Sequence, residues 1–319
     1  MHPFIYLWDN HDVKQGFPDS TTDICRKVYR EMTPSPVFDS SDHARVYRKI
    51  SLGPMVDLFI IDVQYTRNNR DSIAPGEESY LGIPQYNWLL NELQHSTAKW
   101  KLLANQKMFS PFSIQGYESF IPGGVGGDDK SWDSYQLERH NLLTFIQTNH
   151  INNVMVLSGD AHFVVVSDEP IDPYDSLTYN HNTGAGSVAV EFLPSAISSS
   201  NIDERGIPYS FDPTLVSIAE GLNPHHFYLE FMDNGYGILN IKPDSINAQV
   251  WLLDARTINT NQYLAANLFL DDGANHWRRS TVSSINSVPK NYAISVYPNP
   301  SHDMFYVKWL GTETENIHI

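Results

Sequence analysis

The sequence contains two Asp-x-His triplets, Asp9-Asn10-His11 and Asp160-Ala161-His162. Each follows a short apolar run, residues 4–7 and 154–157, of the kind that forms a buried strand. A carboxylate and an imidazole two residues apart at a strand end can bind one cation. Water on such a cation loses a proton near neutral pH and becomes a nucleophile. The alternative is that both triplets only cap strand ends and that their histidines are structural.

Polar residues also follow two further apolar runs. Residues 58–61 precede Asp62 and Tyr65, and residues 102–104 precede Asn105-Gln106. Ligands of open α/β sheets bind beyond the carboxyl ends of the strands, so the four strand ends predict one polar site. Imidazole, carboxylate and amide oxygen suit Zn, Fe, Mn or Ca better than a haem or a thiolate cluster.

Other polar residues near these strand ends are weaker candidates. The guanidinium groups of Arg67 and Arg70 suit a phosphate or carboxylate held against metal ions. Asn105-Gln106 cannot act as general bases, which leaves hydrogen-bond donation or neutral metal ligation. One member of the pair His225-His226 could reach the site, although we expect a surface position for both.

Composition excludes several classes of function. The 319 residues carry a formal net charge of −16, from 37 acidic and 21 basic residues, so no basic stripe is available for a nucleic-acid backbone. Cys25 is the single cysteine, which excludes an intrachain disulfide, and its amphipathic setting predicts a packed residue. No apolar run reaches eighteen residues, so we expect no membrane span.

Helix and strand patterns alternate in the first half of the chain. Apolar spacing predicts helices over residues 84–93 and from Trp132 to about Asn149, which with the strands is typical of an α/β fold. The glycine-rich segment 123–129 lacks the Lys and the strand-to-helix setting of a phosphate-binding loop, so it predicts a surface or lid loop.

The pattern changes after about Gly184 to strands without helical crossovers. The turn residues 233–236 predict a hairpin between two of these strands. The expected fold class is therefore mixed α/β, with antiparallel strands that extend or back the first sheet. The strands are expected at residues 186–192, 227–231, 237–241 and 248–252.

The two ends of the chain predict further organisation. Residues 1–270 read as one domain, residues 271–291 as a linker and residues 292–319 as the beginning of a small all-β module. The run 4–7 is apolar on both faces and would need a strand on each side. We therefore expect the natural protein to carry an N-terminal portion that this chain lacks.

An ordered set of motifs over about residues 1–254 resembles the PhoD-type alkaline phosphatase and phosphodiesterase family, within the calcineurin-like metallophosphoesterases. The resemblance implies a four-layer αββα sandwich, here incomplete at its N-terminus, around a dinuclear metal site. Iron and calcium are the implied metals, with Zn or Mn as alternatives, and the implied substrate is a small phosphoester. The motifs are Trp8-Asp9-Asn10-His11-Asp12; Asp62, Tyr65, Arg67 and Arg70; Leu81-Gly82, Gln85, Trp88-Leu89, Leu93 and Trp100-Lys101; Trp132-Asp133, Tyr135 and Glu138-Arg139; and Leu157-Ser158-Gly159-Asp160-Ala161-His162.

The resemblance also implies roles for individual residues. Asn10-His11 resembles the pair that contacts a metal or phosphate and assists the leaving group, and Asp160 with His162 resembles the metal-binding Gly-Asp-x-His step. Arg67 and Arg70 resemble phosphate contacts. The predicted metal ligands are Asp9, Asn10, Asp160 and His162, and the predicted catalytic residues are His11, Asn10, Arg67 and Arg70. The family's upstream strands with the first metal-binding aspartates, and in some members a Cys and a Tyr, have no counterpart in this sequence.

A second resemblance concerns the tail. Tyr297-Pro298-Asn299-Pro300 followed by a strand resembles the start of a type-IX secretion sorting domain. This implies a secreted or cell-surface protein that the secretion machinery exports through the outer membrane, with a signal peptide in the missing N-terminal portion.

We therefore expect a metal-dependent phosphoester hydrolase, of mono- or diesters, in which metal-bound hydroxide attacks phosphorus. The alternatives are another metal-dependent hydrolase on the same fold and a non-catalytic surface protein that binds metal or ligand.

Overall fold

The computed structural model describes residues 4–10, 12, 20–33, 45–64, 79–115, 131–256, 261–279, 294–297 and 306–309. The chain forms two compact units, Met1–Arg279 and Ser280–Ile319. The glycine-rich segment 123–129, predicted to be a surface or lid loop, lies outside the described residues.

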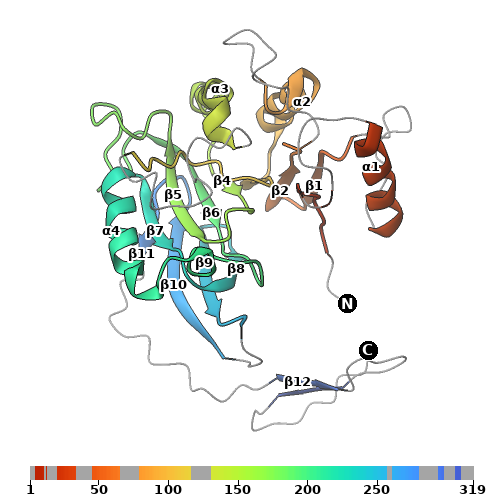
Figure 1. Ribbon diagram of the computed structural model, residues 1–319. Helices are drawn as coiled ribbons and strands as arrows, with labels where there is room; N and C mark the ends of the chain where they lie inside the picture. Colours follow the sequence, from red (N-terminus) through yellow and green to blue (C-terminus); the bar gives the residue numbers. More distant parts are fainter. Residues whose placement is uncertain are drawn as a thin grey trace. The chain divides into compact units, whose positions relative to one another are not determined.

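A seven-stranded mixed sheet is the centre of the first unit (Figure 1). Its middle strands β2, β3, β4 and β6 run parallel, whereas β1, β5 and β7 are antiparallel to their neighbours. The near-continuous burial of the middle strands matches their apolar sequences, because strands covered on both faces need apolar side chains on both. In spatial order the strands are β1 (Arg48–Leu52), β2 (Val56–Ile60), β3 (Trp100–Ala104), β4 (Val154–Leu157), β6 (Ser187–Leu193), β5 (Val164–Pro170) and β7 (His226–Glu230).

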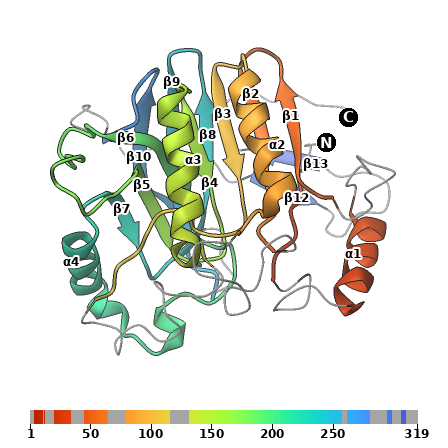
Figure 2. The same ribbon diagram turned by 90° about the horizontal axis from the view of Figure 1, so that it is seen from above.

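Two helices cover one face of this sheet. Figure 2 shows α2 (Gly82–His95) and α3 (Gln136–Thr148) side by side in front of it. Leu89 and Leu93 of α2 and Leu142 of α3 are buried against the sheet's outer face. Both helices lie where the 3.6-residue spacing of apolar side chains predicts them, with a short 3₁₀ helix, Trp132–Tyr135, leading into α3.

A four-stranded antiparallel sheet packs on the other face. Its strand order is β11-β10-β9-β8. Every second side chain of β9 is buried, because one face of this sheet packs against the large sheet. Apolar side chains of both sheets form one of the two large cores, as predicted for a mixed α/β fold whose antiparallel strands back the first sheet. The strands are β8 (Asn234–Ile241), β9 (Ser245–Leu253), β10 (Gln262–Asp271) and β11 (Arg278–Arg279).

Two smaller cores complete this unit. Helix α4 (Asp212–Leu222) packs Leu215 and Ala219 against Phe163 and Phe231, which lie directly before β5 and directly after β7. It follows two 3₁₀ turns, Asp203–Arg205 and Tyr209–Phe211. Helix α1 (Ser20–Met32) places Tyr29 and Cys25 against the fully buried Trp8, which confirms that Cys25 is a packed residue.

The run at residues 4–7 does not form the predicted central strand. Phe4, Ile5 and Tyr6 are 72%, 48% and 41% exposed, and the segment has no strand geometry. A two-sided apolar strand needs a hydrogen-bonded neighbour and cover on both faces, and in the described sheet β1 pairs with β2 at this edge. The segment is held instead by Leu7, which packs against the core, and by the Arg48 guanidinium, which donates to the carbonyl oxygen of Tyr6 over 3.1 Å.

The predicted hairpin at residues 233–236 is also wrong. Strand β7 pairs with β5 in the large sheet, whereas β8 pairs with β9 in the small one, so this segment crosses between sheets. Gly235 is required there for a different reason than a turn. A Cβ atom at this position would lie 2.3 Å from the carbonyl oxygen of Trp251 on β9.

The first unit ends at Arg279, so the segment predicted as a linker, 271–291, begins inside it. Trp277 is fully buried, and its indole donates to the carbonyl oxygen of Ser167 over 3.0 Å. In the second unit, strands β12 (Ile294–Tyr297) and β13 (Tyr306–Trp309) pair antiparallel. No helix of the described residues has the length and apolarity needed to cross a membrane.

Candidate functional site

The carboxyl ends of β2, β3 and β4 lie side by side. Ile60 pairs with Ala104, and Ala104 pairs with Leu157, so the residues after each strand emerge at one edge of the sheet. Each of these three strands is followed by a stretch of polar residues. They are Asp62 and Gln64 after β2, Asn105 to Lys107 after β3, and Ser158 to His162 after β4.

Two predicted metal ligands meet on one lysine at this edge. The Lys107 ammonium nitrogen lies 2.6 Å from Oδ1 of Asp160 and 3.2 Å from Oδ1 of Asp9. The Lys107 side chain is 5% exposed, whereas both carboxylates are 29% exposed. One carboxylate from each Asp-x-His triplet therefore faces the same positive charge, so Asp9 and Asp160 lie at the same edge of the sheet.

Asp9 is held by several further donors. Its Oδ1 accepts hydrogen bonds from the Gln64 side-chain amide (2.5 Å) and from the backbone N–H of Asn10 (2.7 Å), and its own N–H donates to Asp12 (2.9 Å). Burial raises the pKa of Asp9 to about 6, against the lowering effect of Lys107, and the nearby Asp160 raises it further. Two carboxylates this close favour a cation between them.

Asp62 positions the segment that carries Asp9. It is 1% exposed, and its Oδ1 accepts from the Trp8 indole (3.0 Å), the Gln64 backbone N–H (2.9 Å) and the Gln106 amide (3.2 Å). Its backbone is fixed in turn by Gln85 of α2, whose amide group both accepts from the Asp62 N–H and donates to its carbonyl oxygen. Because Oδ1 of Asp62 accepts from three donors, Asp62 holds Trp8 and Gln64 in place.

The loop after β4 has an unusual backbone. Asp160 and His162 have φ values of 69° and 64°, in the left-handed region that costs a residue with a Cβ atom about 1 kcal/mol or more. This turn projects the Asp160 carboxylate toward Lys107. The imidazole Nδ1 of His162 lies 2.9 Å from the carbonyl oxygen of Ser200, which orients the ring.

A fully buried carboxyl group connects the loops after β3 and β4. Glu191 on β6 accepts hydrogen bonds from the Ser158 hydroxyl and from the backbone N–H groups of Phe109 (2.7 Å) and Ser110 (3.0 Å). Burial raises the pKa of Glu191 to about 8, and Glu169 adds to the rise, whereas these three donors lower it.

Asn105 and Gln106 act by hydrogen bonding, one of the two roles expected for them. The Asn105 amide donates to Ser158 (3.0 Å), and its oxygen accepts from the Lys107 backbone N–H (3.1 Å) and the Trp132 indole (3.2 Å). The amide oxygen of Gln106 accepts from the Val63 N–H over 3.1 Å. Both therefore fix the strand ends rather than project into the site.

The paired histidines do not lie on the surface as predicted. His225 and His226 are 1% and 7% exposed, and the Nε2 atoms of both rings lie 3.0 and 3.2 Å from the carbonyl oxygen of Pro111. Burial lowers the pKa of His226 to about 3 and that of His225 well below its ordinary value. Both imidazoles are therefore neutral and belong to the core, because the antiparallel pairing of β7 places them inside.

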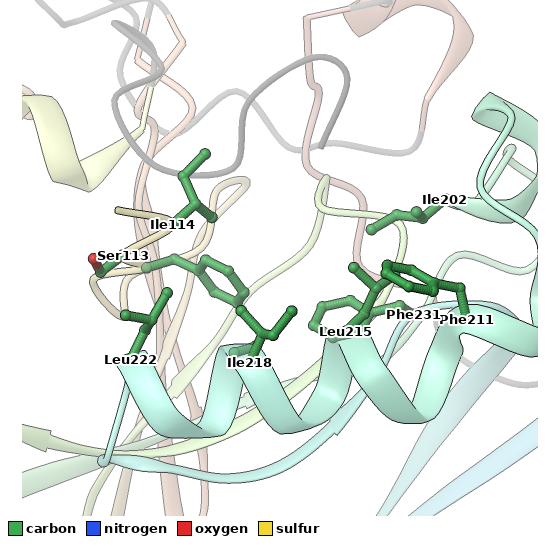
Figure 3. Close-up of a pocket in the computed structure, with 10 residues that line it drawn as sticks. Ser113, Ile114, Ile202, Phe211, Leu215, Ile218, Leu222 and Phe231 are labelled. Carbon is green, nitrogen blue, oxygen red and sulfur yellow. The ribbon is translucent and has the colours of Figure 1, made fainter. Parts of the chain in front are cut away.

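Apart from the sheet edge, the structure has an apolar pocket between α4 and the loop after β3. Figure 3 shows Leu215, Ile218 and Leu222 of α4 facing Ile114 and Ile202. Its lining carries no acid or base group, so it does not add to the chemistry at the sheet edge.

Several predicted site residues cannot be placed. His11, Arg67 and Arg70 lie outside the described residues, and so does Tyr65. Asn10 is described through its backbone N–H bond to Asp9. Within the described ranges, no three His, Cys, Asp or Glu side chains converge as a complete metal site.

The donors that the structure does bring together fit a hard cation. Two carboxylates face one positive charge, with an amide beside Asp9 and an imidazole two residues beyond Asp160. Sequence reasoning missed Lys107, Gln64 and Glu191. Lys107 follows Asn105 and Gln106 after β3, a position that by itself does not distinguish it from a solvated lysine.

The chain is similar in sequence to known phosphatases over the part that carries these residues. A family model described as PhoD-like phosphatase matches residues 1–250. Alkaline phosphatase D of Bacillus subtilis (strain 168) is 27% identical to this chain over an alignment of 195 residues, and the match covers 53% of this chain and 33% of that protein.

A solved structure titled "Structure of PhoD" has a similar fold. It superposes with a TM-score of 0.65 at 20% sequence identity, over 88% of this chain and 55% of that one. At this identity the likeness concerns the fold, with its large mixed sheet and separate antiparallel sheet. The chain thus spans about a third of the length of the curated relative and about half of the solved chain.

Proposed function

The chain belongs to the PhoD-like phosphatase family, and we propose that it is a metal-dependent hydrolase of small phosphomonoesters or phosphodiesters. The observation that carries this proposal is the convergence of Asp9 and Asp160 on one positive charge at the carboxyl edge of the sheet. This is where ligands of such sheets bind. The relative's name, alkaline phosphatase D, supports the same class of reaction.

The residues that would hold metal are Asp9, Asn10, Asp160 and His162. Their oxygen and imidazole donors suit iron and calcium, or zinc and manganese. A metal ion held there would polarise the phosphoryl group and lower the pKa of a water molecule.

The chain's own residues would supply the remaining requirements. We assign His11 as the donor of a proton to the leaving oxygen, and Arg67 and Arg70 as donors to the phosphoryl oxygens, whose negative charge increases in the transition state. Asp62 keeps Trp8 in place and so fixes the segment that carries Asp9 and Asn10.

Metal content and hydrolysis test the proposal together. The full chain is assayed with a chromogenic phosphodiester and a phosphomonoester, with and without a chelator. Asp160→Ala and His162→Ala are expected to lower both the bound metal and the rate. Glu220→Ala, at an exposed position on α4, is the control and should change neither. Unchanged metal content in both site variants would contradict the ligand assignment.

We further propose that the tail directs export to the cell surface or the medium through a type-IX secretion system. The supporting feature is the segment Tyr297-Pro298-Asn299-Pro300 ahead of strand β13. Expression in a bacterium with that system, with and without residues 292–319, tests it. The shortened chain should remain inside the cell, and equal export of both forms would exclude this role.

A further inference from the structure

In the part of the chain that the structure describes, Lys107 is the residue whose positive charge pairs with both aspartates. Its ammonium nitrogen lies 2.6 Å from Asp160 and 3.2 Å from Asp9, and its side chain is only 5% exposed. A buried ammonium is stable only when it is paired, so the two carboxylates compensate its charge as it compensates theirs.

The backbone holds Lys107 in this position. Its N–H donates to the Asn105 side chain (3.1 Å), which also accepts from the buried Trp132. The next residue, Met108, is buried in the core beneath α4. The lysine stem is thus fixed at both sides, and the position of its ammonium follows from the fold rather than from a free surface side chain.

We propose that Lys107 is the resident cation of the Asp9–Asp160 pair and that a divalent metal ion binds this pair by displacing its ammonium. This inference rests on the metal-ligand assignment of the proposed function. Both cations need the same carboxylate oxygens, so they compete, and Lys107 lowers the metal affinity of the site. In return it keeps two neighbouring carboxylates compensated before a metal binds.

Metal titration of charge variants tests the competition. Mn²⁺ is titrated calorimetrically into the wild-type chain, Lys107→Met and the control Lys49→Met. Lys49 on β1 forms its ion pair with Glu92 on α2 rather than with Asp9 or Asp160, so its variant loses a lysine pair that is not part of the site. Lys107→Met should bind Mn²⁺ at least tenfold more tightly than the wild type, and Lys49→Met should match the wild type.

Thermal unfolding gives a second readout. Without metal, Lys107→Met should melt at a lower temperature than the wild type, because Asp9 then faces Asp160 without a cation. Saturating Mn²⁺ should raise its melting temperature more than that of the wild type. Lys107→Gln keeps hydrogen-bond donors near the carboxylates but no charge, and it should also bind more tightly. Lys107→Gln replaces Lys107→Met in both measurements if Lys107→Met does not fold.

Asp160→Asn separates this inference from the proposed function. If Asp160→Asn binds Mn²⁺ like the wild type, the ligand assignment itself fails. If Asp160→Asn loses binding while neither Lys107 variant binds more tightly than Lys49→Met, the ligand assignment stands and the competition is overturned. Weaker binding by the Lys107 variants would likewise overturn it, because the ammonium would then assist the metal.

Discussion

The Ser158 hydroxyl donates a hydrogen bond to Oε1 of Glu191, and the same carboxyl group accepts from two backbone N–H groups beyond β3. Ser158 is two residues before Asp160, and those N–H groups follow Lys107 by two and three residues. One buried side chain on β6 therefore sets the separation of the two loops that bring Asp160 and Lys107 together.

Glu191→Ala is expected to destabilise the fold by about 3 kcal/mol or more. It leaves two buried N–H groups and one hydroxyl without their acceptor, and each such loss costs about 1–3 kcal/mol. Ser158→Ala removes one donor to Glu191 and the acceptor of the Asn105 amide but leaves Glu191 bonded to Phe109 and Ser110, so its cost should be smaller, about 1–2 kcal/mol. Urea unfolding of both variants measures the difference. Equal losses would mean that Glu191 does not act as this link.

The buried pair of Arg139 and Glu169 should be more sensitive to the loss of one partner than to the loss of both. Their side chains are 4% and 0% exposed and 2.6 Å apart, and Arg139 also donates to the carbonyl oxygen of Phe109. Arg139→Met leaves a buried carboxyl group without its partner, for which we expect a loss of about 3–5 kcal/mol in unfolding free energy.

The control for that prediction is an exposed pair. Arg278→Met breaks the bidentate contact with Asp271 at the edge of the small sheet, which should cost less than about 1 kcal/mol. Adding Glu169→Gln to Arg139→Met should recover part of the loss. If the double variant loses the sum of the two single losses, the coupling between Arg139 and Glu169 is absent.

His11→Ala should lower turnover about 10²-fold or more while the bound metal stays unchanged. The reason is that a general acid acts when the leaving oxygen gains charge. The loss should be larger on an alkyl ester than on a nitrophenyl ester, whose leaving group needs no proton. His140→Ala, at an exposed position on α3, is the control. Wild-type turnover on the alkyl ester would exclude this role for His11.

The sequence predicts the parallel strands and their polar ends well, because four-residue apolar runs such as 154–157 occur where both faces of a sheet are covered. It predicts less well which strands pair with one another. The run at 4–7 is also apolar but is half exposed, since composition does not say whether a neighbouring strand exists. The turn residues 233–236 give a local signal, and only the packing of two sheets shows that the chain crosses between them there.

In the candidate site too, the sequence predicts some residues, and others become evident only in the folded structure. Asp9 and Asp160 could be found because each follows a strand-like run and precedes a histidine. Lys107 could not, because lysine after a strand is usually a solvated residue, and its charge becomes informative only once both aspartates face it. His225 and His226 read as polar surface residues, but antiparallel pairing of β7 buries them.

The last prediction concerns the pH dependence of stability and Glu230, at the end of β7. Burial raises the pKa of Glu230 from 4.5 to about 8; the nearby Asp233 and Asp212 add to the rise, and the backbone N–H groups of Met232 and Asp233 lower it. Between these values the folded chain keeps a proton that the unfolded chain has lost. The contribution of Glu230 to stability is therefore complete below about pH 4.5 and is lost as pH rises to about 8.

Glu230→Gln should remove this dependence, because an amide stays neutral and its oxygen still accepts from Met232 and Asp233. The unfolding free energy of Glu230→Gln relative to the wild type should grow between pH 4.5 and 8, by up to about 4–5 kcal/mol, and then stay constant. Urea unfolding at several pH values measures it. Glu220→Gln replaces an exposed carboxylate on α4 and should follow the wild type at every pH. A constant difference between Glu230→Gln and the wild type from pH 4.5 to 8 would show that Glu230 ionises in the folded chain as it does in the unfolded one.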